Sequence, residues 1–260
     1  MIYLKLLRPK DWAKNLFLYI PLFFAGEIFN WIKVFHVFEG FVAFCCIASS
    51  IYIINDYTDI EDDKKHPEKR NRPIASGAVS PTVALTIFAI LVVAGFVTAY
   101  FINSRFLFLL ALYFFLNIGY SFGLKNIPIL DIFIIAIGFA LRVRSGGNIA
   151  KVDVTIWLNI MIFLLALFMA AGKRRDDVLL KISSGNDMRK SVKGYTLDFL
   201  NALLALISSV MIVSYFMYTV SDRVIERHET NRLYLTSLFV MAGIMRYLQI
   251  IYVNADSGSP

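Results

Sequence analysis

Long apolar runs separated by short polar connections dominate this chain of 260 residues. A helix that crosses a bilayer needs about 20 mostly apolar residues. Eight runs approach that length, and they cover residues 16–32, 35–54, 81–102, 106–122, 127–141, 154–172, 199–220 and 233–253. The first and the fifth are short or interrupted by polar residues. The pattern predicts an all-α fold, a polytopic transmembrane helix bundle with eight visible spans in a single integral-membrane domain over residues 1–260.

Composition supports lipid as the solvent, because 58% of the residues are hydrophobic and only 17% are charged. Soluble chains run nearer 45–50% apolar and about 25% charged. These values exclude a secreted disulfide scaffold, a disordered chain and a cytosolic enzyme with one compact core. The adjacent Cys45 and Cys46 lie inside an apolar run and offer no basis for a disulfide framework or a metal site.

Basic residues are distributed unevenly between the two sides of the predicted bundle. Seventeen of the 26 Lys and Arg residues fall at the N-terminus and in alternate connections, against eight on the opposite side. Positive residues accumulate in cytoplasmic loops. The N-terminus and the site are therefore predicted on the cytoplasmic side of a cell (inner or plasma) membrane. This placement also accounts for the net charge of +7 without a nucleic-acid partner.

The densest chemistry follows the second apolar run. Asn55, Asp59 and Asp63 are spaced i, i+4 and i+8, so a continuous helix would line them up on one face. Asp56 lies beside Asn55, and Tyr52 lies one turn earlier. Carboxylates stacked in this way repel one another in a low dielectric. A divalent cation relieves that repulsion, and Mg²⁺ prefers hard oxygen ligands completed by substrate phosphates.

A basic string that includes Lys69 and Arg72 follows these acids and suits the remaining phosphate charge. The alternative is a solvated loop in which the six acids and five bases between Asp56 and Arg72 neutralise each other. The acids begin on the last turn of a predicted span, where unpaired ionisable groups are costly and usually functional. A functional site is therefore the favoured interpretation.

The run from Asn55 to Asp63, followed by Arg72-Pro73 and Ser76-Gly77, resembles the first aspartate-rich motif of the UbiA superfamily of intramembrane prenyltransferases. The resemblance implies a bundle of about nine transmembrane helices around a cavity open to the cytoplasm, with a Mg²⁺-diphosphate bound at this motif. Most members carry a second motif, Asp-x-x-x-Asp, after the sixth span. Here Asp177 is followed four residues later by Lys181, so the second motif is absent.

Other segments are similar to the decaprenyl-phosphate phosphoribosyltransferase branch of that family. They are residues 7–15, 69–77 and 120–125 and the Gly-Lys-Arg run at 172–174. In that branch the bound diphosphate belongs to phosphoribosyl pyrophosphate (PRPP), and a polyprenyl phosphate is the acceptor. The resemblance implies a Mg²⁺-dependent pentosyltransferase that makes cell-wall precursors, and it leaves homo-oligomer formation open.

The resemblance assigns roles to individual residues. Asp56, Asp59 and Asp63 would be catalytic, and with Asn55 they would hold the metal. The expected substrate-binding residues fall into two groups, those near PRPP and those near the acceptor phosphate. They are Lys69, Arg72 and Lys125 in the first group, and Lys14, Arg142, Lys173 and Arg174 in the second. Tyr52 and Tyr120 are further substrate-binding candidates, with neither substrate specified.

Several features admit simpler interpretations. Lys14, Lys125 and the basic triplet 173–175 could anchor the chain at the membrane surface. Asp131 is expected to pair with a cation inside the bundle. Arg142 and Arg144 are placed at the end of the fifth run, and Gly146-Gly147 is interpreted as a turn.

Two rival functions remain open. An ordinary prenyltransferase, which attaches a polyprenyl chain to an aromatic or tetrapyrrole acceptor, shares the first motif but should carry the second. A cation-coupled transporter should place carboxylates near the middle of the membrane on broken helices, whereas most acids here lie at the predicted cytoplasmic end.

Overall fold

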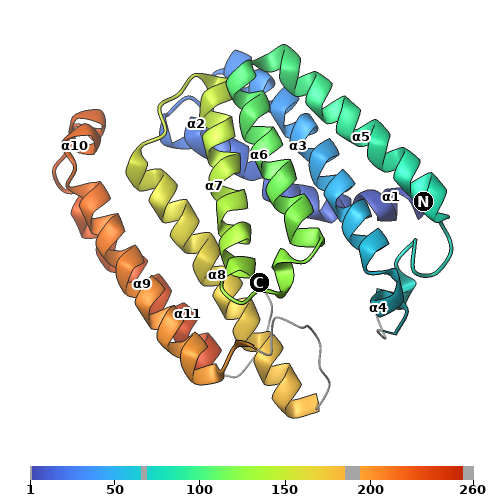
Figure 1. Ribbon diagram of the computed structural model, residues 1–260. Helices are drawn as coiled ribbons and strands as arrows, with labels where there is room; N and C mark the ends of the chain where they lie inside the picture. The colour runs from blue at the N-terminus through green and yellow to red at the C-terminus, as the bar shows by residue number, and fades with distance from the viewer. Residues whose placement is uncertain (1, 66–68, 185–193, 254–260) are drawn as a thin grey trace. The chain divides into compact units, whose positions relative to one another are not determined.

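The computed structural model describes residues 2–65, 69–184 and 194–253, and every regular element in these ranges is a helix (Figure 1). The chain divides into two compact units, residues 1–125 with 141–154, and residues 126–140 with 155–260. One catalytic domain over residues 1–260 remains a prediction.

The elements follow in chain order, with η marking a 3₁₀ helix. The first unit holds α1 (Ile2–Leu7), η1 (Pro9–Tyr19), α2 (Ile20–Phe24), α3 (Trp31–Thr58), α4 (Ile60–Lys65), η2 (Lys69–Asn71), α5 (Pro81–Ile102) and α6 (Ser104–Ser121). The short η3 (Leu124–Asn126) begins in the first unit and has its last residue in the second. Helix α7 (Leu130–Ala150) begins in the second unit and ends in the first. The second unit continues with α8 (Ile156–Ser184), α9 (Leu197–Thr219), α10 (Asp222–His228), η5 (Leu233–Thr236) and α11 (Ser237–Tyr252).

Seven helices within the described residues are long and apolar enough to cross a membrane. They correspond to the predicted runs from the second to the eighth. The prediction of eight such helices is therefore wrong by one, because the run at 16–32 does not form a long α-helix. Its place is taken by η1 and the short α2, with Pro21 at the start of α2 and Gly26 in a left-handed turn at φ +73°.

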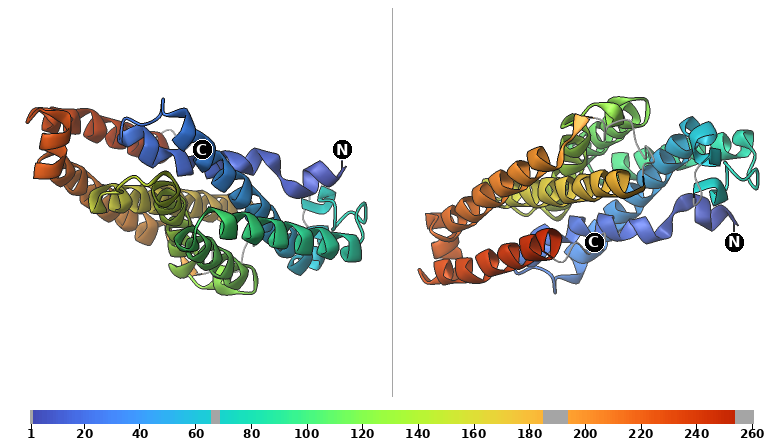
Figure 2. Two further views of the ribbon diagram at one scale, coloured as in Figure 1. Left: turned by 90° about the horizontal axis from the view of Figure 1, so that it is seen from above. Right: turned by 90° about the horizontal axis from the view of Figure 1, so that it is seen from below.

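The N-terminal segment nevertheless runs beside α3 between Asp56 and Phe41, in the opposite direction (Figure 2). Four contacts establish this path: Arg8 with Asp56, Trp12 with Ser49, Asn15 with Cys45, and the ring of Tyr19 with that of Phe41. A 3₁₀ helix rises about 2.0 Å per residue, more than an α-helix does. The 11 residues of η1 therefore extend further along α3 than the same number of α-helical residues would.

The helix that forms at the fifth predicted run, 127–141, extends further than expected, because α7 continues to Ala150. Arg142 and Arg144 consequently lie inside the helix instead of at its end. The interpretation of Gly146-Gly147 as a turn is wrong for the same reason. A Cβ at Gly146 would overlap the backbone of Leu18, so this glycine permits close contact between η1 and the second half of α7.

Local signals account for where several helices begin. The side chains of Asn30, Ser80, Asn103 and Thr196 accept hydrogen bonds from the backbone N–H three residues later, at the starts of α3, α5, α6 and α9. Such caps satisfy backbone donors that have no partner within the helix.

Each unit has its own apolar packing. In the first, α3 packs against α5 and α6, and the ring of Phe44 contacts those of Phe106 and Tyr113. In the second, α8 and α9 pack side by side around buried residues that include Phe168, Leu204 and Ile207.

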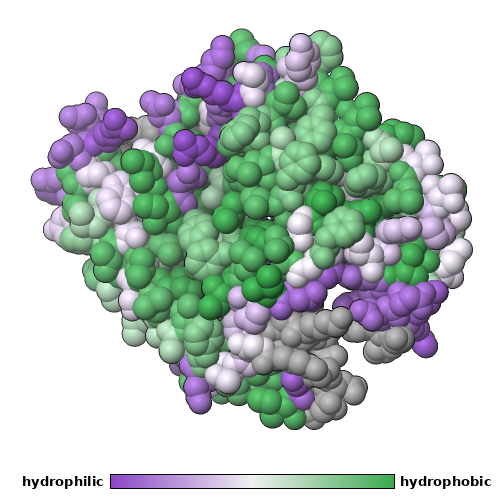
Figure 3. All heavy atoms as spheres, viewed as in Figure 1, coloured by the Kyte–Doolittle hydropathy of each residue, from purple (hydrophilic) through white to green (hydrophobic). Residues whose placement is uncertain are grey.

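Large apolar side chains are nevertheless exposed along the helices. On α5 and at its end, Ile90, Val93 and Phe101 are 62%, 62% and 81% exposed. Apolar residues cover much of the helical surface visible in Figure 3. Monomeric soluble proteins rarely expose contiguous apolar patches of this kind. Together with the seven candidate spans, this surface identifies a multi-pass membrane protein.

Candidate functional site

The acidic motif lies where α3 ends and α4 begins. Helix α3 stops at Thr58, and Asp59 adopts φ −101° and ψ 10° before α4 starts at Ile60. Backbone hydrogen bonds still connect Asp59 N to Asn55 O and Asp63 N to Asp59 O, at 3.1 and 2.8 Å. The backbone register therefore continues through the bend.

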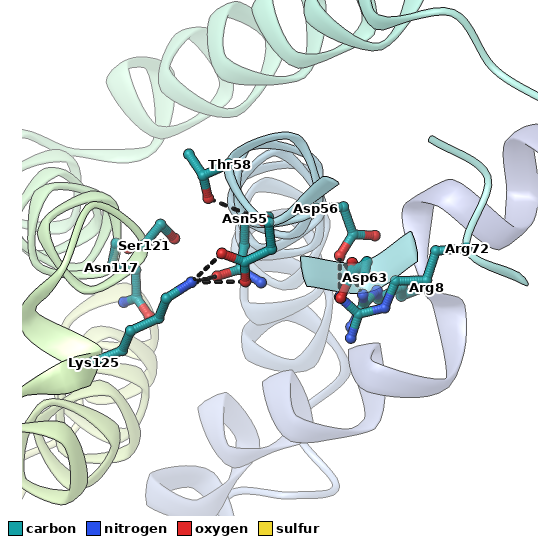
Figure 4. Close-up of polar contacts among 10 residues, drawn as sticks. Arg8, Asn55, Asp56, Thr58, Asp63, Arg72, Asn117, Ser121 and Lys125 are labelled. Carbon is teal, nitrogen blue, oxygen red and sulfur yellow. Dashed lines mark hydrogen bonds and ion pairs between the residues drawn. The ribbon is translucent and has the colours of Figure 1, made fainter. Parts of the chain in front are cut away.

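One group forms around Lys125, which lies in η3. Its Nζ donates to both carboxylate oxygens of Asp59, at 2.6 and 2.7 Å, and to Oδ1 of Asn55 at 3.3 Å. Figure 4 shows Lys125 pointing toward Asn55 on one side of α3. The side chains of Lys125 and Asp59 are 21% and 27% exposed, so water reaches this group.

A second group forms on the other side of α3 (Figure 4). Arg8 and Arg72 both donate to Oδ1 of Asp56, at 2.6 and 3.0 Å, and Arg72 also donates to Asp63 at 2.7 Å. The guanidinium of Arg8 lies over the ring of Tyr52, 4.9 Å from its centroid. Asp56 and Asp63 are only 2% and 4% exposed in their side chains. Two arginines therefore neutralise two buried carboxylates.

The expected single line of Asn55, Asp59 and Asp63 is thus wrong for the side chains. Asp63 joins Asp56 through Arg72, while Asn55 and Asp59 share Lys125. Within the described residues, no three His, Cys, Asp or Glu side chains converge as a ready metal cage. Asn55 and Asp59 nevertheless fit Mg²⁺, because their hard oxygens already converge on one cationic atom. Mg²⁺ usually takes one or two carboxylates and fills its other positions with water and substrate phosphates.

Lys14 lies next to Tyr52 in the same unit. Its Nζ donates to Asp11 at 2.7 Å. Burial acts to lower the pKa of Lys14, but Tyr52 and Asp11 outweigh it and hold the pKa above its ordinary value. Lys14 is therefore a cation at neutral pH, and half of its side chain is exposed.

Arg142 lies in the same unit as the acidic motif, in the interior of α7. It is 6% exposed and donates to Oδ1 of Asn15 and to the hydroxyl of Tyr113, both at 2.8 Å. Its guanidinium also lies over the rings of Tyr113 and Phe44. Arg142 thus connects η1, α6 and α7.

The other predicted residues of this unit are half-buried. Lys69 lies in η2, close in sequence to Arg72, and Tyr120 lies in the last turn of α6, five residues before Lys125. All predicted site residues from Lys14 to Lys125, together with Arg142, therefore belong to the first unit.

Lys173 and Arg174 belong to the second unit. Lys173 is exposed on α8. Arg174 is 2% exposed, and it donates to Asp131 at 2.5 Å and to Asp177 at 2.7 Å. Two carboxylates neutralise this guanidinium, and binding of an acceptor phosphate by Arg174 stays a prediction. The expectation that Asp131 pairs with a buried cation is confirmed.

Tyr195 completes this buried group. Its hydroxyl donates to Asp131 and accepts from the backbone N–H of Ile129, both at 2.6 Å. Burial and the bond to Asp131 raise the pKa of Tyr195, so the hydroxyl stays protonated. Ile129 has φ +71°, which is unfavourable for a β-branched residue.

The sequence interpretation missed four of these residues, Arg8, Asn15, Tyr113 and Tyr195. A signal existed for Arg8, which precedes Pro9 as Arg72 precedes Pro73, and both arginines contact Asp56. Tyr113 and Tyr195 carried no distinguishing pattern. Three basic residues counted in the orientation argument, Arg189, Lys190 and Lys193, lie outside the described residues.

Known proteins share both the sequence and the fold. The profile of the UbiA prenyltransferase family matches residues 16–177. A decaprenyl-phosphate phosphoribosyltransferase of Mycolicibacterium smegmatis is 35% identical over 98% of this chain and 82% of its own. The Mycobacterium tuberculosis protein of that name (strain H37Rv) is 31% identical over 82% of this chain and 72% of its own.

A solved UbiA homolog from Archaeoglobus fulgidus, bound to GPP and Mg²⁺, superimposes with a TM-score of 0.79. The alignment covers 99% of this chain and 89% of that one at 20% identity, which establishes a shared fold. The family match over more than half of the chain and the identity to the mycobacterial proteins agree with it. This chain belongs to the UbiA prenyltransferase family.

Proposed function

We propose that this chain transfers 5-phosphoribose from PRPP to a polyprenyl phosphate and releases pyrophosphate. The bond between C1 of the ribose and the diphosphate breaks, and a bond forms between C1 and an oxygen of the acceptor phosphate. The proposal is supported by the names of the mycobacterial relatives and by the contacts of the acidic motif.

One observation carries the proposal. Three oxygens of Asn55 and Asp59 surround a single cationic atom at a position that water reaches. Such a position suits a Mg²⁺-diphosphate, and when bound the metal would neutralise charge on the leaving diphosphate. Asp56 and Asp63 would hold Arg8 and Arg72 in place beside it.

The basic residues of the first unit would bind phosphate oxygens. Arg72, Lys125 and the neighbouring Lys69 are assigned to PRPP, with Tyr52 and Tyr120 beside them. Lys14, which remains charged and half-exposed, and Arg142 are assigned to the acceptor phosphate. That phosphate is already an oxyanion near neutral pH, so it needs alignment against C1 more than a general base.

Lys173 is retained as an acceptor-binding residue because its side chain is exposed. Arg174 acts in this proposal by holding α7 and α8 together through Asp131 and Asp177. We also propose that the N-terminus and the acidic motif face the cytoplasm, on the strength of the distribution of Lys and Arg. Assembly into a homo-oligomer stays a prediction.

The first rival is transfer of a prenyl chain from a prenyl diphosphate. It gains support from the fold of the GPP-bound homolog and from 26% identity to a 4-hydroxybenzoate octaprenyltransferase of Pasteurella multocida. The segment expected to carry the second acidic motif argues against it. Its carboxylate Asp177 is neutralised by Arg174, and Lys181 stands where a second acid is expected.

The second rival is cation-coupled transport. Among the described residues, Asp131 is fully buried within a candidate span, but it pairs with Arg174 and Tyr195. An acid with two partners of this kind is poorly suited to carry an ion. Flux across liposomes without product formation would favour this rival.

The deciding experiment incubates the purified full chain in nanodiscs with PRPP, Mg²⁺ and a polyprenyl phosphate. Mass spectrometry should detect a lipid-linked phosphoribose, and Asp59→Ala should abolish it. A parallel reaction contains a prenyl diphosphate and 4-hydroxybenzoate. A separate binding measurement compares PRPP with the prenyl diphosphate, each in the presence of Mg²⁺. Binding of the prenyl diphosphate together with no binding of PRPP would overturn the proposal.

A further inference from the structure

The two groups of the acidic motif differ in how easily their cations can be replaced. The cations of the Asp56–Asp63 group are two arginines from distant segments, which share an oxygen of Asp56. A metal at Asp56 would have to displace both guanidinium groups from carboxylates that water barely reaches. The ion pairs of this group are therefore not expected to exchange when a metal or substrate binds.

The Asn55–Asp59 group has one cation, and it is the ammonium of Lys125. A lysine ammonium is a compact, strongly hydrated charge on a flexible four-carbon stem. Its three oxygen contacts, at 2.6, 2.7 and 3.3 Å, come from side chains one helical turn apart. A rotation of the Lys125 side chain would open the position without moving either helix (Figure 4).

We infer that Lys125 is an exchangeable cation, which occupies the metal position of Asn55 and Asp59 until a diphosphate arrives. This inference rests on the proposed function for the identity of the diphosphate. Without an anion, a divalent metal must compete with the ammonium and then tolerate a like charge beside it. With a diphosphate present, the ammonium would move from Asp59 to a phosphate oxygen, which would leave the oxygens of Asn55 and Asp59 available to hold the metal.

The exchange makes metal binding depend on the diphosphate. Asp59 stays paired in both states, first with Lys125 and then with the metal, so no carboxylate is left as an uncompensated charge. Lys125 also finds an anionic partner in both states. A metal without a diphosphate satisfies Asp59 but leaves Lys125 unpaired, which disfavours that state.

The test measures binding of Mn²⁺ alone to the full chain in nanodiscs, with free Mn²⁺ followed by electron paramagnetic resonance. We expect Lys125→Met to bind Mn²⁺ about tenfold or more tightly than the unaltered protein, because it removes a like charge a few ångströms away that water only partly screens. Adding Asp59→Asn to Lys125→Met should cancel the gain. Lys125→Arg, which keeps the charge, should bind as weakly as the unaltered protein.

Lys33→Met is the matched control, because Lys33 pairs with the half-exposed Glu27 at the opposite end of α3. An equal gain in Lys33→Met would mean that net charge alone governs binding and would overturn the inference. Unchanged or weaker binding in Lys125→Met would also overturn it, as would a gain that survives Asp59→Asn. If Lys125→Met folds poorly, Lys125→Gln takes its place. The measurement contains neither PRPP nor lipid, so its failure is distinguishable from failure of the phosphoribosyl-transfer assay.

Discussion

Replacing Arg174 by Met should lower the free energy of unfolding, because Arg174 neutralises a buried carboxylate. This effect on stability should be larger than any effect on substrate binding. The guanidinium is 2% exposed and holds Asp131, which is fully buried, at 2.5 Å. Without the guanidinium, the Asp131 carboxylate keeps the hydrogen bond from the Tyr195 hydroxyl but loses the charge that neutralises it. Removal of one partner of a buried ion pair costs about 3–5 kcal/mol. For a chain of this size that loss corresponds to a fall in Tm of about 6–20 °C.

The assay is thermal unfolding of the purified protein in one detergent, with near-ultraviolet circular dichroism. Lys173→Met is the matched control, because it removes the same charge one residue earlier from an exposed position, and it should change stability by less than about 0.5 kcal/mol. The double variant Asp131→Asn with Arg174→Met removes both charges together. It should recover part of the loss, since an uncharged pair leaves no buried ion.

An unchanged Tm in Arg174→Met, combined with a raised KM for the polyprenyl phosphate, would refute this reasoning. Arg174 would then be available to substrate, as the sequence alone suggested, and the ion pairs with Asp131 and Asp177 would contribute little.

Three further predictions use other contacts. Gly146→Ala should lower stability by about 1–3 kcal/mol through overlap with Leu18, whereas Gly243→Ala, whose Cβ would meet no atom within 4 Å, should be neutral or stabilising by about 0.5–1 kcal/mol; both are checked by thermal unfolding. Because the pKa of Tyr195 is raised on folding, its contribution to stability is present below the unfolded value of about 10 and is lost as pH rises above it; in Tyr195→Phe, unfolding midpoints should fall less steeply above pH ~10. Arg142→Lys should raise the KM for the polyprenyl phosphate and leave that for PRPP nearly unchanged, since one ammonium cannot reproduce the two hydrogen bonds to Asn15 and Tyr113; a rise in KM for both substrates would contradict the assignment.

The membrane helices were predictable because the signal is local. A span such as α5 is specified by its own 22 residues, with Ser80 capping the start and Pro81 in its first turn. No distant residue has to be known. The acidic motif was predictable for the same reason. Burying charged side chains at the end of an apolar run costs free energy whatever the later part of the chain does, so such charges indicate function.

The path of η1 was not predictable in this way. Asp11, Lys14 and Asn15 interrupt its apolar pattern, so the segment does not resemble a span. Its polar side chains are matched by partners on other elements. Asn15, for example, donates to Cys45 and accepts from Arg142, which is 127 residues away in the sequence. A polar residue at membrane depth becomes tolerable only when such a partner exists, and spacing cannot reveal it.

The division of the acidic motif follows from the same dependence on partners. Regular spacing placed Asp63 with Asp59, and the backbone register does continue between them. Asp56 decides the arrangement, since a carboxylate that is 2% exposed cannot remain ionised at low cost without nearby cations. Arg72 meets this need and draws Asp63 into the same group. Arg8 meets it from the N-terminal side, in a left-handed conformation at φ 51°, a backbone state that persists only where surrounding contacts determine it. The two Arg-Pro pairs at 8–9 and 72–73 were therefore a better guide to this site than the regular spacing of the acids. A buried carboxylate needs neighbouring cations, and this need decides its partners more strongly than its position on a helix face does.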